Sequence, residues 1–244
     1  MKRWLLMMSA VCMVATAAAQ AEPARILVFG DSNSWGWQAT PDGFPAVRHA
    51  DDVRWAGVLD AALSDAIVVV DGLIGRRTDL AGQGDIALVA ANDFNGASAL
   101  PEAIARHMPL DLVVIMLGTN DLQVGVGRSP DEVAAAAFGL AALVQGSDNP
   151  VFSAYAAPEV LIVAPPPLSD TTATPLSGLF QEGVAASAKL GGAFAAEAER
   201  SGIPFFDAGA VTATDGVDGI HLTAANHAAL GTALAPVIQQ LLLN

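Results

Sequence analysis

Short runs of apolar, β-branched residues alternate along the chain with longer alanine-rich stretches. The apolar runs are nearly continuous, which is typical of strands that are covered on both faces of a sheet. The alanine-rich stretches have helical length, and Ser129 and Thr223 stand where an N-cap residue belongs. The expected strands cover 25–29, 66–70, 110–117, 160–164 and 204–206, and the expected helices cover 54–63, 99–107, 130–144, 179–201 and 223–243.

This alternation predicts an α/β fold. Strands that are separated by helices favour a parallel sheet with helices on both faces. We therefore expect a three-layer α/β/α sandwich around a central five-stranded parallel sheet. With 244 residues, of which 53% are hydrophobic, the chain can bury one substantial core, and its length does not demand a second domain.

The first 21 residues follow the three-part plan of a secretory signal peptide. A basic start is followed by an apolar run at 4–14 and by a series of small residues at 15–21. The apolar run is shorter than the roughly 20 residues that span a bilayer, which disfavours an uncleaved membrane anchor. We expect cleavage after Ala19 or Ala21, a mature domain at 22–244, and export to the periplasm or the medium.

The charge of the chain excludes some partners. The formal net charge is −14 and no basic run occurs, so the surface repels phosphate backbones and anionic lipid heads. We therefore expect no binding to nucleic acid or to membranes. The single cysteine, Cys12, lies in the expected signal peptide, and His49, His107 and His227 lack a recognised metal spacing. We expect no metal site and no cofactor.

Residues that can take part in chemistry follow four of the expected strands. Ser32 comes after the first strand in a Gly-Asp-Ser turn, Gly75 after the second and Asn120 after the third, whereas Asp218 and His221 lie in the loop after the fifth. The carboxyl ends of the strands in an open parallel sheet line its ligand crevice. We therefore expect these five residues to converge at one edge of the sheet.

Together these residues supply what acyl transfer requires. Ser32 offers a hydroxyl nucleophile, His221 a base, and Asp218, three residues earlier, a carboxylate that can orient the base. The backbone N–H groups of Ser32 and Gly75 and the side-chain amide of Asn120 can stabilise an oxyanion. The sequence therefore predicts an enzyme with a serine nucleophile.

Each of the short sequence segments that carry these residues, called blocks here, also has an ordinary structural interpretation. Ser32 can cap a helix, Asp218 can belong to a surface turn, and 118–121 can be a turn after a buried strand. Trp35 and Trp37 are candidate walls of a substrate crevice, although tryptophans beside a strand end are more often part of the core.

The order of the blocks resembles the SGNH (GDSL-type) hydrolase family, and in particular its bacterial arylesterase/acyltransferase branch. The resemblance extends over almost all of the expected mature chain. The matching strings lie at 30–37, 52–55, 95–98, 116–121, 164–168, 205–209 and 215–221.

The resemblance implies a flavodoxin-like fold and a serine esterase that forms an acyl-enzyme. Ser32, Asp218 and His221 are the implied catalytic triad, and Ser32, Gly75 and Asn120 are the implied oxyanion hole. Members of this branch hydrolyse small aryl and alkyl esters, transfer acyl groups to alcohols or peroxide, and form oligomers. We therefore expect a small-molecule ester substrate, a water or alcohol acceptor, and a homo-oligomer.

The chain departs from the family pattern beside two of the blocks. Asn33 stands where the family usually has leucine, and Ile74 is bulkier than the small residue that often precedes the oxyanion glycine. We count Ile74, with Trp35 and Trp37, among the expected substrate-binding residues. Two other functions stay open, a carbohydrate O-acetylesterase and a non-catalytic glycan-binding module.

Overall fold

Five parallel strands form one central sheet in the computed structural model, which describes residues 22–148, 153–214 and 217–243. All five expected strands are present, and their order in the sheet is β2-β1-β3-β4-β5. Their bounds are Ala24–Gly30 (β1), Ala66–Gly72 (β2), Leu112–Met116 (β3), Glu159–Ala164 (β4) and Phe205–Asp207 (β5).

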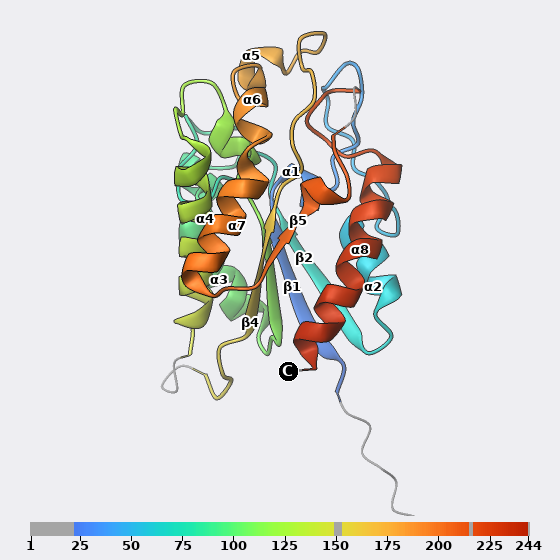
Figure 1. Cartoon of the computed structure of the whole chain (residues 1–244), viewed down its shortest axis with the longest axis vertical. Coiled ribbons are helices and arrows are strands. Elements are labelled where there is room, and N and C mark those ends of the chain that lie inside the picture. Colours follow the sequence, from blue (N-terminus) through green and yellow to red (C-terminus); the bar gives the residue numbers. More distant parts are fainter. Residues whose placement is uncertain (1–21, 149–152, 215–216, 244) are drawn as a thin grey trace, which may run out of the picture.

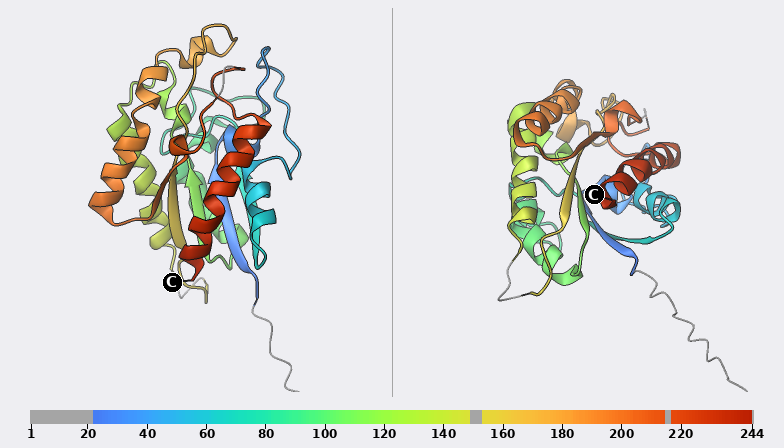
Figure 2. Two further views of the ribbon diagram at one scale, coloured as in Figure 1. Left: turned by 45° about the vertical axis from the view of Figure 1, so that its right-hand side comes forward. Right: turned by 60° about the horizontal axis from the view of Figure 1, so that its bottom comes forward.

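Helices cover both faces of this sheet (Figure 1). The helices α3, α4 and α7 lie on one face and α2 and α8 on the other, so the sheet is the middle of three layers (Figure 2). The predicted α/β/α sandwich is therefore confirmed. The bounds are Trp55–Ala62 (α2), Gly96–His107 (α3), Pro130–Gln145 (α4), Leu190–Ser201 (α7) and Ala224–Leu242 (α8).

The apolar strands fill a core on each side of the sheet. Successive side chains of a strand point to opposite faces, so Leu27 and Phe29 of β1 pack beneath α3 and α4, whereas Ile26 and Val28 pack beneath α2 and α8. All four are fully buried, and each stabilises the fold by about 1.5–3 kcal/mol through removal of apolar surface from water. This double burial explains why the strand sequences show no alternation of apolar and polar residues.

The expected continuous helix at 179–201 is wrong. The structure divides this region into α5 (Ser177–Phe180), α6 (Val184–Ser187) and α7. Gly183 lies between the first two, and a Cβ atom there would lie 2.5 Å from the carbonyl oxygen of Leu122. The chain passes so close to the turn after β3 that packing overrides the local helical preference.

The register of the strands aligns their carboxyl ends. Gly30 of β1 pairs with Gly72 of β2 and with Met116 of β3, so the segments that follow the three strands leave the sheet at the same edge. The strand order reverses its direction between β1 and β3, and ligand crevices of open sheets lie at such points.

None of the helices that the structure describes is both long enough and apolar enough to cross a membrane. The expected signal peptide, residues 1–21, lies outside the described residues.

Candidate active site

Ser32 begins a single helical turn, α1 (Ser32–Trp35), directly after β1. The residue that caps this turn is Asp31, whose carboxylate accepts a hydrogen bond of 2.9 Å from the backbone N–H of Asn33. The interpretation of Ser32 as a capping residue is therefore wrong. Because Asp31 supplies the cap, the Ser32 hydroxyl is free to interact elsewhere.

His221 and Asp218 lie beside the Ser32 hydroxyl, as predicted. Nε2 of His221 is 3.1 Å from Oγ of Ser32, and Nδ1 of the same ring is 2.8 Å from Oδ2 of Asp218. A carboxylate on Nδ1 holds the ring proton on that nitrogen, so the lone pair of Nε2 faces the hydroxyl. This arrangement can remove the hydroxyl proton while the oxygen attacks an electrophile.

Asp218 is fully buried, and its two oxygens have separate partners. Oδ2 faces the ring of His221, whereas Oδ1 accepts the backbone N–H groups of Ile220 at 2.9 Å and of His221 at 2.8 Å. Burial alone raises the pKa of this carboxyl, but the hydrogen bonds from the His221 ring and from the two backbone groups outweigh it, and the pKa is lowered. Asp218 therefore carries a negative charge at neutral pH.

Glycine at position 219 allows the loop to place Asp218 and His221 on the same side. Gly219 has a φ of +78°, and a Cβ atom there would lie 2.7 Å from the carbonyl oxygen of Asp170. The Gly219 carbonyl accepts hydrogen bonds of 2.9 Å from the hydroxyl of Thr214 and from a backbone N–H. The loop is therefore held tightly against the segment that follows β4.

Gly75 lies at the same edge of the sheet, after β2. Its φ of +82° is in the left-handed region, which glycine adopts without strain. In residues 22–148, 153–214 and 217–243, neither the N–H of Gly75 nor that of Ser32 has a hydrogen-bond acceptor. Both donors are thus available to an oxygen of a ligand.

Asn120 reaches this edge in the turn η2 (Thr119–Leu122) after β3, but its side-chain amide is already engaged. Nδ2 donates to Oδ2 of Asp31 at 3.2 Å and to the carbonyl of Arg76 at 3.1 Å, and Oδ1 accepts from Nε2 of Gln123 at 2.9 Å. A further acceptor must share or replace one of the two bonds from Nδ2. Donation by Asn120 to an oxyanion stays a prediction.

The carboxyl of Asp31 is buried between the turn that carries Ser32 and the side chain of Asn120. Burial raises the pKa of Asp31 to about 7, although the hydrogen bond from the backbone of Asn33 and the charge of Arg76 oppose this rise. The guanidinium of Arg76 in turn donates to the carbonyl of Gly30 at 3.0 Å. The ends of β1 and β2 and the turn after β3 are therefore joined by buried polar contacts.

A hollow of about 330 Å³ opens beside Gly75. Ile86, Phe94 and Leu179 give it an apolar wall, and Gln123 adds a polar group. Its volume is at the lower end of the range of pockets that hold small molecules. This is the hollow that adjoins the expected oxyanion hole.

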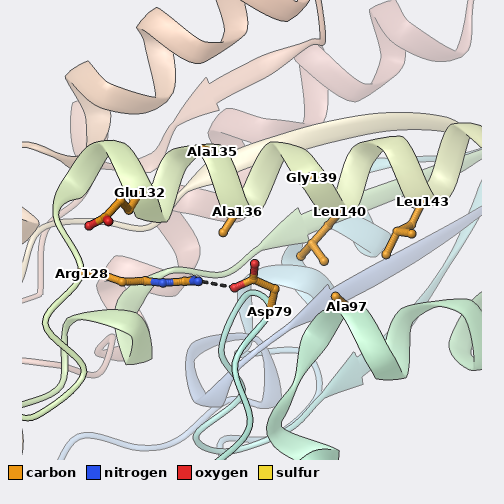
Figure 3. A pocket seen from close by; sticks show the side chains of 9 residues that line it. All are labelled: Asp79, Ala97, Arg128, Glu132, Ala135, Ala136, Gly139, Leu140 and Leu143. Atoms are coloured by element: carbon orange, nitrogen blue, oxygen red, sulfur yellow. Dashed lines mark ion pairs between the residues drawn. The ribbon is translucent and has the colours of Figure 1, made fainter.

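Another hollow, of about 530 Å³, lies between α3 and α4 (Figure 3). Arg128 and Asp79, which form an ion pair, line part of it, and the small side chains of Ala136 on α4 and Ala97 on α3 face it from opposite sides. It shares no lining residue with the Ser32 site. We therefore assign the chemistry to the sheet edge and not to this hollow.

The family described as GDSL-like lipase/acylhydrolase matches the chain over residues 28–229. The chain belongs to this family. The expected membership of the SGNH (GDSL-type) hydrolases is thereby confirmed, and so is the expectation of an enzyme that cleaves esters.

Several solved structures, two esterases among them, resemble this GDSL-like hydrolase along most of its length. The native aryl esterase of M. smegmatis is 44% identical, with a TM-score of 0.83, and the match covers 89% of this chain and 99% of that one. A carbohydrate acetylesterase of Sinorhizobium meliloti is 40% identical, with a TM-score of 0.82, and the match covers 89% of this chain and 99% of that one. Comparison with curated protein sequences gave no match.

The three expected substrate-binding residues of this GDSL-like hydrolase lie in different surroundings. Trp37 is buried and stacks on His221, with ring centroids 4.4 Å apart. Trp35 is half-buried beneath the guanidinium of Arg48, and Ile74 is half-buried directly before Gly75. Contact of these three residues with substrate stays a prediction.

Sequence reasoning missed several residues that hold the site of this hydrolase together. The side chain of Asn33 binds the backbone on both sides of His221, and Gln123 orients the amide of Asn120. Asn33 carried a signal in the sequence, since it directly follows Ser32 and departs from the usual leucine. In the described part of the chain, no group of three or more His, Cys, Asp or Glu side chains is placed to hold a metal ion.

Proposed function

We propose that this hydrolase is a serine esterase in which Ser32 is the nucleophile, His221 the general base and then acid, and Asp218 the orienting carboxylate. The observation that carries the proposal is the chain of contacts from Oγ of Ser32 to Nε2 of His221, at 3.1 Å, and from Nδ1 to Asp218, at 2.8 Å. Hydroxyl, imidazole and carboxylate in this order form the machinery of acyl transfer on several unrelated folds.

The reaction proceeds in two halves. Oγ of Ser32 attacks the ester carbonyl while its proton passes to Nε2 of His221, and Asp218 stabilises the imidazolium that forms. His221 then gives this proton to the leaving alcohol, which departs and leaves the acyl group on Ser32. A water molecule, deprotonated by His221, then attacks the acyl-enzyme, and His221 returns this proton to Oγ of Ser32 as the acid leaves.

The N–H groups of Ser32 and Gly75 and the amide of Asn120 stabilise the oxyanion in both halves. The free N–H groups of Ser32 and Gly75 support this assignment, whereas Asn120 must share one of its present hydrogen bonds. Loss of a single donor of this kind typically costs about 10²–10³ in kcat.

We infer that the substrates are short-chain aryl or alkyl esters, acetyl esters among them. The hollow beside Gly75 is small and has an apolar wall, which favours a short acyl chain or a small alcohol. Ser32 is only 4% exposed, which disfavours bulky groups on both sides of the ester. Transfer of the acyl group to an alcohol or to peroxide follows if such an acceptor displaces water in this hollow.

A second candidate substrate class is the O-acetylated carbohydrates. It is supported by the 40% identity to the carbohydrate acetylesterase of Sinorhizobium meliloti. The same triad serves both substrates, so the two candidates differ only in the group that leaves. Acetylated xylan and p-nitrophenyl acetate therefore discriminate between them, and a strong preference for xylan overturns the aryl or alkyl ester assignment.

Export and self-association complete the proposal. The basic, apolar and small-residue segments at 1–21 support export with cleavage, and the proposed homo-oligomer rests on the resemblance to the arylesterase branch. Mass spectrometry of the protein recovered from the periplasm tests cleavage after Ala19 or Ala21. Sedimentation of the mature protein tests the oligomer.

The decisive experiment is turnover of p-nitrophenyl acetate by wild type, Ser32→Ala and Ser34→Ala. Ser34 lies two residues further in the same turn, is buried, and has no partner for its hydroxyl in the described residues, so it is a matched control. We expect turnover by wild type and by Ser34→Ala, and its loss in Ser32→Ala. Added primary alcohol should divert product from acetate to a new ester.

Two results overturn the proposal. Equal turnover by wild type and Ser32→Ala excludes Ser32 as the nucleophile. Failure of a fluorophosphonate to label Ser32 in wild type leaves the alternative of a binding module without catalysis.

A further inference from the structure

Asn33 joins the turn that carries Ser32 to the loop that carries His221. Its Nδ2 donates to the carbonyl of Ile220 at 3.2 Å, and its Oδ1 accepts the backbone N–H of Leu222 at 3.0 Å. These two partners are the residues immediately before and after His221. The side chain of Asn33 therefore binds the backbone on both sides of His221.

The position of this side chain is itself well defined. Asn33 is 2% exposed, and its backbone N–H donates to Oδ1 of Asp31 at 2.9 Å. The orientation of the amide is unambiguous, because its donor faces a carbonyl and its acceptor faces an N–H. Asn33 is thus a rigid connection between two backbones and not a surface group that can move aside.

Few other bonds join the two segments. Among the described residues, three hydrogen bonds connect the turn at 31–36 with the loop at 217–223, and Asn33 makes two of them. The third is the bond between Ser32 and His221 itself. Asp218 cannot replace Asn33, because it belongs to the same loop as His221 and moves with it.

We propose that Asn33 is a positioning residue that sets the distance between Nε2 of His221 and the hydroxyl of Ser32. The inference rests on the proposed function, since it concerns the proton transfer in that mechanism. Misplacement of a reacting group by about 1 Å can cost on the order of 10² in rate. Loss of the Asn33 side chain therefore lowers the rate of attack by Ser32 and leaves the hydrogen bond between His221 and Asp218 intact.

The first test replaces the amide by an apolar side chain of similar size. Asn33→Leu removes both bonds to the His221 loop without leaving a large cavity. The matched control is Asn226→Ala, which removes the hydrogen bonds that Oδ1 of Asn226 accepts from the backbone N–H and the hydroxyl of Thr223, at the far end of the same loop, and does not touch the Ser32 turn. Both variants lose buried or half-buried hydrogen bonds, but only one loses a connection to the nucleophile.

Three measurements are made on each variant: kcat and KM for p-nitrophenyl acetate, the rate of inactivation by a fluorophosphonate, and the free energy of unfolding. For Asn33→Leu we expect kcat and the inactivation rate to fall together by about 10- to 100-fold, with KM unchanged. For Asn226→Ala we expect wild-type kcat and inactivation rate. A comparable loss of kcat in both variants overturns the inference, because it points to loop stability in general.

A double-mutant cycle separates positioning from damage to the fold. If Asn33 acts through His221, then Asn33→Leu causes no further loss of turnover in a His221→Ala background. Additive losses overturn the inference. The low-field proton resonance of the hydrogen bond between Nδ1–H of His221 and Asp218 should persist in Asn33→Leu. Its disappearance would contradict the inference that Asn33 affects only the contact between His221 and Ser32.

If Asn33→Leu does not fold, Asn33→Ser, which keeps a small polar side chain, takes its place in the same measurements with the same expectations. Turnover that survives Ser32→Ala overturns the proposed function and this inference with it. Turnover that is lost in Ser32→Ala but unchanged in the Asn33 variant overturns this inference alone.

Discussion

The indole of Trp37 lies flat on the imidazole of His221, with ring centroids 4.4 Å apart and planes 7° from parallel. The edge of Phe44 contacts the same indole, with centroids 5.5 Å apart. The face of an aromatic ring attracts a cation, and in the proposed mechanism His221 becomes an imidazolium when it accepts the proton of Ser32. The stacking therefore stabilises the base most strongly when it is charged.

We expect Trp37→Leu to lower kcat by about 3- to 30-fold, the range that corresponds to a cation–π contact of roughly 0.7–2 kcal/mol. Trp37→Phe should retain part of this rate because it keeps an aromatic face. Steady-state kinetics with p-nitrophenyl acetate measures both variants. An increase in KM with kcat unchanged contradicts this expectation and favours Trp37 as a substrate wall.

The orientation of the Asn120 amide depends on a relay, a chain of hydrogen bonds between side chains. Nη2 of Arg77 donates to Oε1 of Gln123 at 2.8 Å, and Nε2 of Gln123 donates to Oδ1 of Asn120 at 2.9 Å. Among the described residues, Gln123 is the donor to Oδ1 of Asn120, so its removal leaves this buried oxygen without a partner and allows the amide to rotate.

We therefore expect Gln123→Leu to lower kcat by about 10-fold, less than the roughly 10²–10³ typical for the loss of an oxyanion donor itself. Asn120→Ala supplies that upper limit in the same assay. Gln83→Leu is the control, because Gln83 lines the same hollow but its amide reaches the carbonyl of Val124 and not Asn120. Equal rates for the two glutamine variants would show that the relay has no influence.

The buried carboxyl of Asp31 makes stability depend on pH. Its pKa rises from 3.8 to about 7 on folding, so between these values the folded protein binds a proton that the unfolded chain releases. The contribution of Asp31 to the free energy of unfolding has its full size below pH 3.8 and is lost as the pH rises to about 7.

We expect wild type to lose up to about 4 kcal/mol of unfolding free energy relative to Asp31→Asn between about pH 4 and pH 7. Urea unfolding of both proteins across this range measures the difference between their unfolding free energies. The contributions of the other titrating groups cancel in this difference because both proteins contain them. A constant difference would mean that Asp31 keeps its ordinary pKa in the folded protein.

His227 has the opposite dependence. It is fully buried, its Nδ1 accepts the backbone N–H of Trp55 at 3.2 Å, and burial lowers its pKa from 6.5 to about 3. The folded protein therefore favours the neutral ring, and this contribution is complete above pH 6.5 and is lost as the pH falls towards 3.

We expect wild type to lose up to about 1.4 kcal/mol per pH unit below pH 6.5 relative to His227→Asn, in which an amide oxygen replaces Nδ1 as acceptor. Unfolding curves at about pH 7.5 and about pH 4.5 measure this change for both proteins. Parallel losses of stability in wild type and variant would contradict the role of His227.

The sequence by itself determined the layers of the fold and the edge at which the chemistry lies. The five strands were predictable because side chains buried on both faces give continuous apolar runs, such as Leu112–Met116 in β3. Ser32, Gly75, Asn120 and His221 each follow a strand, and parallel strands end at one edge. Local pattern and topology were therefore sufficient to group them.

The tertiary structure decided the contacts between segments that are far apart in the chain. The bonds from Asn33 to the neighbours of His221 span 187 and 189 residues, and no local pattern encodes a partner at such a distance. The stacking of Trp37 on His221 and the break of the expected helix at Gly183 arise in the same way. Each depends on which surfaces meet when the layers close, and that is a property of the packed molecule and not of any single segment.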